Sequence, residues 1–264
     1  MNDSSEPLLV EQRTDGITVL TLNNPARRNA LDPPLVQALV AAVSNLRSDP
    51  TVRCVVVTGN GTAFCSGADL GALRDQPKRD AMGGRDLLRC FYEVFLGFRE
   101  LRMPVIAAVN GAAVGAGLNL ALSCDIRIAA RSARFAASFV HLGIHPGGGT
   151  TYLLTRLVGS GVAAEMLMSG LPVDADRALA VRLVNRVVDD AAAVTSAIEL
   201  ATAIAANSPQ AVRATKRTLA ITLDTTFAAT VELESLTQAM SQESADAAEG
   251  WEAFRQRRPP RFSD

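Results

Sequence analysis

The feature that most constrains this chain is a strand-to-helix turn of small residues near its middle. Residues 105–109 (VIAAV) form a short, β-branched apolar run, as expected for a strand buried on both faces. A turn at Asn110-Gly111 and small residues over 112–117 lead into an apolar helix. Such a turn exposes unpaired N–H groups at a helix N-terminus, where negative charge is stabilised. The sequence therefore predicts either a main-chain anion or oxyanion site, or a tight corner whose glycines only permit close packing.

A dinucleotide-binding fingerprint is a third interpretation, and the residues argue against it. Gly115 and Gly117 supply the first two glycines of that pattern, but Leu120 occupies the position of the third. No acidic residue lies near position 135, where one would hold the ribose. A dinucleotide cofactor is therefore not expected.

A second turn of the same kind follows an earlier buried strand. Residues 52–58 form that strand, and Thr62–Leu70 (TAFCSGADL) lead from it towards the next helix. The two turns lie about fifty residues apart in the sequence. Either turn alone is unremarkable, and it is the pair that carries information about function.

The rest of the chain alternates strands with helices and then continues as helices. Residues 8–22 alternate around a central Asp-Gly, which predicts a β-hairpin. Asp32, followed by two prolines, predicts a helix start. The segment 71–85 is charged and lacks periodicity, so we interpret it as mobile. Later helices are expected at roughly 149–158, 160–169, 174–181, 190–206, 208–222, 224–241 and 244–257, with a short strand over 183–188. This order favours an α/β core with a helical C-terminal appendage.

Composition excludes several classes of function. The 264 residues carry a net charge of −1, which gives no basic field for nucleic acid or an anionic membrane. No apolar run reaches the roughly 18 to 20 residues that span a bilayer. The four cysteines form no CxxC pair, and the only two histidines have no cysteine near them, so a metal site is not expected. We expect a cytoplasmic protein with reduced thiols.

Six segments make the chain resemble the crotonase (enoyl-CoA hydratase/isomerase) superfamily. In the family's order they are NPARRNALD (24–32), FCSGADL (64–70), PVIAAVNGAAVGAGLNLALSCDIRIA (104–129), FVHLGIHPGGG (139–149), LVNRVV (183–188) and EGWEAFRQRR (249–258). The resemblance implies an α/β fold with a ββα spiral core over 1–200 and a helical C-terminal trimerisation region over 201–264. It also implies a homotrimer or a dimer of trimers, and acyl-CoA ligands of fatty acid metabolism. Coenzyme A is then the carrier part of the substrate, with no separate cofactor.

The resemblance also assigns roles to particular residues. The main-chain N–H groups of Ser66 and Ala116 are expected to bind the thioester oxygen and stabilise an enolate. The positions implied to contact the substrate or its coenzyme A are Arg27, Arg28, Ala30, Ser66, Ala68, Asp69, Leu70, Gly115, Phe254 and Arg257. The last two are expected to reach coenzyme A across a trimer interface.

Three of these neighbourhoods have simpler explanations. Arg27 and Arg28 are also compatible with an ordinary solvated loop. Asp69 has the spacing of an N-cap for the following helix, which we prefer to a ligand contact. Cys65 is expected to be a packed small side chain, because no histidine is close in sequence to activate it.

The sequence departs from the family where hydration chemistry is performed. Hydration needs one group to deprotonate water and another to deliver a proton to Cα. The family's hydratases use two glutamates, and the corresponding positions here hold Asn119 and Phe139. Neither side chain transfers a proton at neutral pH. Since each such group contributes ~10²–10⁴ in rate, ordinary enoyl-CoA hydration is not expected.

Three interpretations remain open. In the first, other residues transfer protons: His141 is the nearest titratable side chain, and acidic residues of the adjoining segments are Asp75, Asp80, Asp86 and Glu93. In the second, the protein binds acyl-CoA or fatty-acyl groups without converting them, and Phe139 makes the site apolar. In the third, which is least favoured, the chain is a structural subunit of a mixed oligomer.

Overall fold

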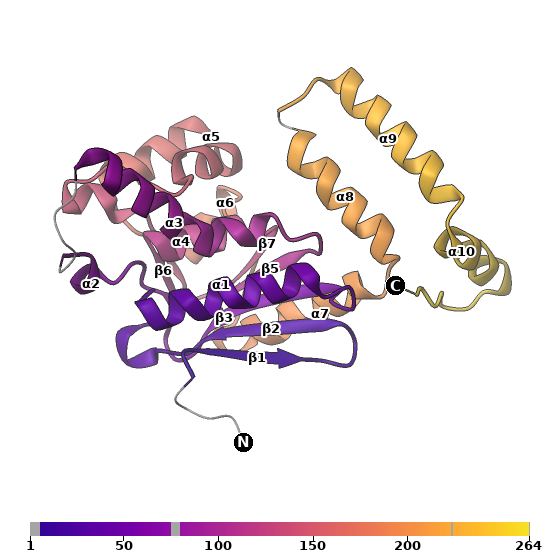
Figure 1. Cartoon of the computed structure of the whole chain (residues 1–264), viewed down its shortest axis with the longest axis horizontal. Coiled ribbons are helices and arrows are strands. Elements are labelled where there is room, and N and C mark those ends of the chain that lie inside the picture. The colour runs from indigo at the N-terminus through magenta and orange to yellow at the C-terminus, as the bar shows by residue number, and fades with distance from the viewer. Residues whose placement is uncertain (1–5, 75–79, 223, 264) are drawn as a thin grey trace.

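A computed structural model describes residues 6–74, 80–222 and 224–263, which form two β-sheets, surrounding helices and a C-terminal helical arm (Figure 1). The predicted hairpin is confirmed, because β1 (Leu8–Gln12) pairs antiparallel with β2 (Ile17–Leu22). Gly16 in its turn has φ 78°, a conformation that glycine adopts without strain.

The larger sheet has six strands in the order β1-β2-β3-β5-β7-β10. Its remaining members are β3 (Cys54–Gly59), β5 (Val105–Val109), β7 (Ile126–Ala130) and β10 (Arg186–Val188). Every pairing from β2 to β10 is parallel. Parallel pairing explains the continuous apolar runs of β3 and β5, because such strands are covered on both faces.

The smaller sheet has the order β4-β6-β8-β9 and consists of very short strands. They are β4 (Ala63–Cys65), β6 (Ala112–Val114), β8 (Arg134–Ala136) and β9 (Val173–Asp174). β4, β6 and β8 each follow a strand of the larger sheet after a short turn and precede a helix. This repetition is the predicted ββα spiral, although the short strands themselves could not be separated from turns in the sequence.

Helices cover both faces of the larger sheet. Helix α1 (Pro33–Ser48) begins as predicted, with Asp32 Oδ1 accepting a hydrogen bond from Leu35 N at 3.1 Å. The other core helices are α2 (Leu70–Arg74), α3 (Ala81–Arg99), α4 (Ala116–Ser123), α5 (Thr150–Ser169), α6 (Ala175–Ala180) and α7 (Ala193–Ala205). Three 3₁₀ turns complete the core: η1 (Pro25–Arg27), η2 (Ser138–Leu142) and η3 (Asp190–Ala192).

The segment 71–85, which lacks clear periodicity in the sequence, is helical over most of the part that the structure describes. Residues 71–74 belong to α2 and residues 81–85 to the first turns of α3. Asp80 Oδ1 accepts a hydrogen bond from Gly83 N at 2.7 Å and so caps α3. The cap compensates for the glycines of this turn. Residues 75–79 lie outside the described residues.

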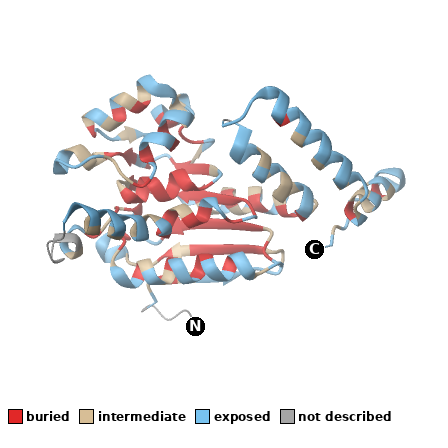
Figure 2. Ribbon diagram, turned by 45° about the horizontal axis from the view of Figure 1, so that its top comes forward, coloured by how far each residue is buried: buried red, intermediate tan, exposed pale blue. Residues whose placement is uncertain are grey.

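The strands of the larger sheet divide their side chains between two hydrophobic layers. Val55 and Val57 pack in the layer that contains α1, α3 and α4. Cys54 and Val56 point to the opposite face, where they meet the alanine stripe of α7. Figure 2 shows the buried residues concentrated in this sheet and in the helices against it. The alternation follows from the two-residue repeat of a β-strand.

The last three helices extend away from the core as an arm (Figure 1). They are α8 (Pro209–Thr222), α9 (Phe227–Gln242) and α10 (Ala245–Gln256). Most of their residues are exposed (Figure 2). Helix α7 runs across the predicted boundary at residue 200 and packs on the sheet, so the arm itself begins at α8. Within the described chain, no helix has the length and hydropathy needed to cross a membrane.

Candidate active site

The two small-residue turns lie side by side at the carboxyl ends of β4 and β6. These strands are parallel neighbours, with Ala63 opposite Ala112 and Cys65 opposite Ala113. Ser66 therefore follows one strand, and the turn into α4 follows the other. The sequence placed these turns fifty residues apart, and the small sheet brings them into contact.

Glycine makes the close approach of the two turns possible. A Cβ on Gly117 would lie 2.1 Å from the Cys65 carbonyl oxygen, which is far inside any contact distance. Gly67 has φ 98°, and a Cβ there would lie 2.6 Å from the Val114 carbonyl oxygen and 3.4 Å from Ala116 N. These glycines thus serve packing, as the alternative interpretation proposed, while also placing the Ser66 turn against the amide of Ala116.

Ala116 is the first residue of α4, and Gly115 is its N-cap. Gly115 has φ 54° and, having no side chain, gives the helix no side-chain cap. The first amides of a helix have no intrahelical acceptor and carry the positive end of the helix dipole. The N–H of Ala116 is therefore in a position suited to an oxygen that carries or develops negative charge.

The amide of Ser66 already has an acceptor within the chain. It donates to the Arg28 carbonyl oxygen at 3.0 Å, and Ser66 Oγ donates to the Arg27 carbonyl oxygen at 3.2 Å. Arg28 and Asn29 both have left-handed backbones, with φ 53° and 56°. Asn29 is buried, and its Nδ2 donates to the Ala63 carbonyl oxygen at 2.8 Å, which fixes this loop against β4. A ligand oxygen at Ser66 N must share this donor or displace Arg28.

Arg27 and Asp69 form an ion pair beside this loop. Arg27 Nη2 lies 2.8 Å from Asp69 Oδ1. Asp69 Oδ1 also accepts from the amides of Gly71 and Ala72 at 3.0 and 3.3 Å, which is the capping contact expected from the sequence. The hydrogen bond from Arg27 lowers the pKa of the Asp69 carboxyl. Asp69 is thus occupied by helix capping and by Arg27.

Most of the other residues that the family resemblance assigns to coenzyme A binding lie in two adjoining loops, one over residues 27–31 and one over residues 66–70. Leu31 pairs with Ala68 in a parallel bridge, and Leu31 N donates to the Gly67 carbonyl oxygen at 2.8 Å. Ala30, next to Leu31, is buried, whereas Leu70 is exposed. The Arg28 side chain is exposed and has no ion pair within the described residues, so its charge is available to a ligand.

Asn119 is buried one turn after Ala116, and both ends of its amide are hydrogen-bonded. Its Nδ2 donates to the Gly147 carbonyl oxygen at 2.8 Å, and its Oδ1 accepts from Thr150 Oγ1 at 2.5 Å. A Cβ on Gly148 would lie 2.6 Å from Asn119 Nδ2. Asn119 therefore fastens the glycine-rich segment before α5 to α4, and its side chain is not free for a substrate.

Phe139 and His141 point to different parts of the molecule from the same 3₁₀ turn, η2. Phe139 is half-buried, and its Cζ lies 4.0 Å from the position of a Cβ on Gly115, so its ring faces the start of α4. His141 Nε2 lies 2.8 Å from the Ser169 carbonyl oxygen at the end of α5. This contact favours a structural role for His141.

Two of the acidic candidates, Asp80 and Asp86, have local partners. Asp80 caps α3, and Asp86 pairs with its neighbour Arg85 at 3.1 Å. Glu93 is exposed on α3. Asp75 lies outside the described residues.

The thiol beside the site is unsuited to nucleophilic catalysis. Burial raises the pKa of Cys65 to about 12, so the thiolate that would attack is not populated at neutral pH. Within the described residues, no group of three or more His, Cys, Asp or Glu side chains could hold a metal ion.

Comparison with known proteins identifies the family. The enoyl-CoA hydratase/isomerase profile matches residues 12–264. The chain belongs to the enoyl-CoA hydratase/isomerase family. It is 47% identical over 206 residues to the Mycobacterium tuberculosis protein named "Probable enoyl-CoA hydratase EchA14", covering 78% of each chain. It is 34% identical to enoyl-CoA hydratase EchA19 of the same organism, covering 99% of this chain and 98% of that protein.

Solved structures carry the same fold. The crystal structure of an enoyl-CoA hydratase from Bacillus anthracis matches with a TM-score of 0.92 at 32% identity, over 97% of this chain and 98% of that one. One from Mycobacterium smegmatis matches with a TM-score of 0.90 at 35% identity, over 97% and 98% of the two chains. The crotonase fold inferred from the motifs is therefore confirmed.

Two of the residues carried over from the family lie far from the two turns. Phe254 lies in the last turn of α10, and Arg257 is the C-cap of that helix. Ser66 comes shortly before α2 and Ala116 begins α4, and Figure 1 shows α10 on the opposite side of the molecule from both of these helices. Phe254 is 79% exposed. Within one chain these residues cannot complete the site, so a coenzyme A contact by them requires another copy.

Tyr92 is a polar neighbour of the site that the sequence did not reveal. A Cβ on Gly147 would lie 2.2 Å from the Tyr92 hydroxyl, so this phenol sits beside the segment that Asn119 holds. Tyr92 is half-buried in α3 and packs against Phe95. In the sequence it follows Phe91 in an apolar stripe, and nothing in that pattern separates it from core residues.

Proposed function

We propose that this protein binds acyl-CoA thioesters and stabilises a thioester enolate between the amides of Ser66 and Ala116. The observation that carries the proposal is the contact between the two turns, which places one candidate donor after β4 and the other at the start of α4. A preorganised donor of this kind is typically worth ~10²–10³ in rate. Both proposed donors are main-chain N–H groups, so no particular side chain is needed at position 66 or 116 to bind the thioester oxygen.

The two donors have unequal roles in this proposal. Ala116 N–H meets the thioester oxygen with the dipole of α4 behind it. Ser66 N–H reaches the same oxygen by sharing its hydrogen with the Arg28 carbonyl or by releasing that carbonyl. Binding at Ser66 is therefore coupled to the loop that carries Arg27 and Arg28, which we propose to lie near the phosphates of coenzyme A.

Ordinary hydration is not part of the proposed reaction. Asn119 is held by Gly147 and Thr150, and Phe139 offers no titratable group. The reaction class that fits is one that proceeds through an enolate, the Cα proton passing to a solvent hydroxide or water and returning from solvent. We expect crotonyl-CoA hydration at least about a thousandfold slower than in a relative with both glutamates, since two general acid–base groups contribute ~10²–10⁴ each.

A non-catalytic acyl-CoA or fatty-acyl carrier is the second candidate function. It is favoured by the ring of Phe139, which faces the start of α4 and makes this part of the site apolar. A carrier needs the coenzyme A loop and an apolar chain site but no proton transfer.

The test is calorimetric titration with butyryl-, octanoyl- and palmitoyl-CoA, followed by mass spectrometry of enoyl-, dienoyl- and hydroxyacyl-CoA substrates. Saturable binding with conversion of one substrate class is the expected result. Binding without conversion of any of them would assign the carrier function. No binding at any chain length would refute both.

We further propose that the arm makes a homotrimer or a dimer of trimers. Large apolar side chains are exposed along it, and Phe227 is 86% exposed. The others are Leu236, Met240, Trp251 and Phe254. An exposed apolar surface of this kind is typical of an interface. Sedimentation equilibrium tests the assignment, and a monomer at micromolar concentration would contradict it.

A further inference from the structure

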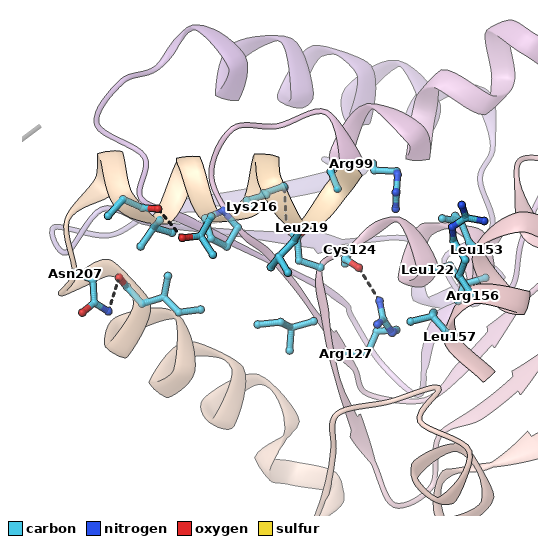
Figure 3. Close-up of a pocket in the computed structure, with 18 residues that line it drawn as sticks. Arg99, Leu122, Cys124, Arg127, Leu153, Arg156, Leu157, Asn207, Lys216 and Leu219 are labelled. Carbon is cyan, nitrogen blue, oxygen red and sulfur yellow. Dashed lines mark hydrogen bonds and ion pairs between the residues drawn. The ribbon is translucent and has the colours of Figure 1, made fainter. Parts of the chain in front are cut away.

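A cavity of 510 Å³ lies between α8 and the core, at the end of α4 remote from Ala116 (Figure 3). Leu122 and Cys124 at the end of α4 and Arg127 in β7 line it from the core side, and Lys216 and Leu219 line it from α8. Ala116 and Leu122 are separated by roughly 9 Å along the helix axis. The volume falls within the range of small-molecule pockets.

Arg127 is a buried cation that forms no ion pair with a carboxylate among the described residues. It is 4% exposed, and its Nε donates to the Leu183 carbonyl oxygen at 2.8 Å. Its Nη1 donates to the carbonyl oxygens of Cys124 and Ala121 at 2.6 and 3.4 Å. Burial lowers the pKa of Arg127, but a guanidinium remains protonated in proteins. A full positive charge therefore lies in the cavity wall. Its hydrogen bonds among the described residues go to main-chain carbonyl oxygens, and the Asp125 carboxylate lies close enough to act on it without pairing with it.

One amino group of Arg127 remains available to a ligand. Nη2 donates to no acceptor among the described residues. Ser123 Oγ is the one fully enclosed side-chain polar atom in the described chain that lacks a partner. Nη2 is therefore not sealed inside protein, and since Arg127 lines the cavity, this group opens onto it.

The charges around the cavity favour an anion. Four lining side chains are cationic and one is acidic: Arg99, Arg127, Arg156, Lys216 and Asp125. Lys216 Nζ pairs with Asp125 Oδ2 at 2.8 Å, and Arg156 pairs with Asp224. Arg99 and Arg127 are the lining cations without a carboxylate partner among the described residues. Most of the remaining lining side chains are apolar, including those of Leu122, Leu153, Leu157 and Val212.

We propose that this cavity binds a monocarboxylate with an apolar chain, its carboxylate on Arg127 Nη2 and its chain along the apolar wall. A single buried guanidinium amino group matches one carboxylate, whereas a doubly charged phosphate would lose more solvation than one donor returns. The site is distinct from the two turns at the other end of α4. The proposal therefore does not depend on acyl-CoA binding.

The test is calorimetric titration of the full-length protein with decanoate, in the presence of saturating octanoyl-CoA. One molecule of decanoate is expected to bind per chain, and decan-1-ol, which lacks the charge, at least tenfold more weakly. Leu219→Asp places a like charge at the exposed mouth of the cavity, so decanoate affinity should fall at least tenfold. Ile221→Asp is the matched control on α8, because Ile221 does not line the cavity. The Ile221→Asp variant should bind decanoate with the same affinity as the unmodified protein.

Three results would overturn the proposal. The first is the absence of saturable decanoate binding. The second is equal affinity in the Leu219→Asp and Ile221→Asp variants. The third is loss of decanoate binding on saturation with octanoyl-CoA, where octanoyl-CoA itself binds, since this would place decanoate in the acyl-CoA site. If decanoate does not bind, and Leu219→Asp but not Ile221→Asp reduces the oligomer size in sedimentation, the cavity is instead part of a contact between copies of the chain.

Discussion

Asn119 occupies the position of a catalytic glutamate in the family's hydratases, but in this chain it makes structural contacts. Its amide both donates and accepts a hydrogen bond. The Nδ2 group donates to Gly147, and Oδ1 accepts from Thr150. A carboxylate has no donor to offer Gly147, so the present arrangement of the glycine-rich segment requires the amide.

Replacing Asn119→Asp should therefore destabilise the fold although the side chain keeps its shape. The substitution places a carboxylate oxygen opposite the Gly147 carbonyl oxygen in a buried site, and the expected loss is at least about 1–3 kcal/mol in the free energy of unfolding. Urea denaturation at pH 7 measures it. Asn45→Asp is the control and should change stability little, because Asn45 is exposed on α1 and its side chain has no hydrogen bond among the described residues. Equal stability of all three proteins would show that the contact is unimportant.

Phe139→Glu should introduce hydration activity. The position faces the start of α4 and is only half-buried, so a glutamate is tolerated there and can exchange protons with a bound thioester. One general acid–base group is expected to raise crotonyl-CoA hydration ~10²-fold or more above the unmodified protein. Phe139→Gln has the same size without the titratable proton, and a gain shared by both variants would argue against the assignment.

The two turns were predictable from motifs, but their present partners were not. FCSGADL and VGAGL located the turns that carry Ser66 and Ala116, and the capping role of Asp69 followed from its spacing. The bond from Ser66 N to Arg28 could not be foreseen, because it depends on left-handed backbones at Arg28 and Asn29, which are uncommon for residues with a side chain.

At the scale of elements, the site depends on how closely α4 approaches β4. The alternatives read from the sequence, an anion site or a packing corner, prove compatible. Gly117 leaves room for the Cys65 carbonyl, and the same contact places the first amide of α4 beside the Ser66 turn. A side chain at position 117 could not be accommodated by a small rotation of another side chain, because the atom it would meet is the Cys65 carbonyl oxygen in the backbone of β4.

Gly117→Ala tests this approach directly. A Cβ 2.1 Å from the Cys65 carbonyl oxygen forces the two elements apart, and we expect a loss of about 2–3 kcal/mol or more in the free energy of unfolding. Gly84→Ala is the matched control in α3, where a Cβ meets nothing within 4 Å and the substitution should stabilise by about 0.5–1 kcal/mol. Similar changes in the free energy of unfolding for Gly117→Ala and Gly84→Ala would mean that α4 and β4 are less closely packed than the structure shows.

Long, strongly patterned elements were predictable, and very short ones were not. The hairpin, β5 and α1 follow from alternation, apolar runs and a capping aspartate. β8 and β9 have three and two residues, too few to show any alternation. β8 forms against the edge of β6, and β9 forms against the edge of β8. Tertiary pairing, rather than local preference, decides such strands.

At the scale of the whole molecule, a charged cluster fastens the C-terminal segment to α10. Arg258 Nη1 lies 2.6 Å from Glu249 Oε1, which also accepts from Arg261 N at 2.7 Å. The hydrogen bond from Arg258 lowers the pKa of Glu249 to about 2 from an ordinary value of 4.5. Because the folded pKa is depressed, the stabilisation is present above pH 4.5 and is lost as the pH falls towards 2.

Glu249→Gln should remove this pH dependence. At pH 7 the variant is expected to melt at a lower temperature than the unmodified protein, and the difference should shrink as the pH is lowered from 4.5 towards 2. Thermal unfolding of both proteins across that range measures it. A difference in melting temperature that does not change with pH would exclude ionisation of Glu249 as its cause.

The most direct test of the account is deuterium exchange at Cα of octanoyl-CoA in D₂O, read by mass spectrometry. Ala116→Pro removes one proposed oxyanion donor at the first position of a helix, where proline is tolerated. Ala245→Pro makes the same change at the first position of α10 and serves as control. Exchange is expected in the unmodified protein and in the control, with a rate ~10²–10³-fold lower in Ala116→Pro. No exchange in the unmodified protein, or equal rates in all three, would contradict it.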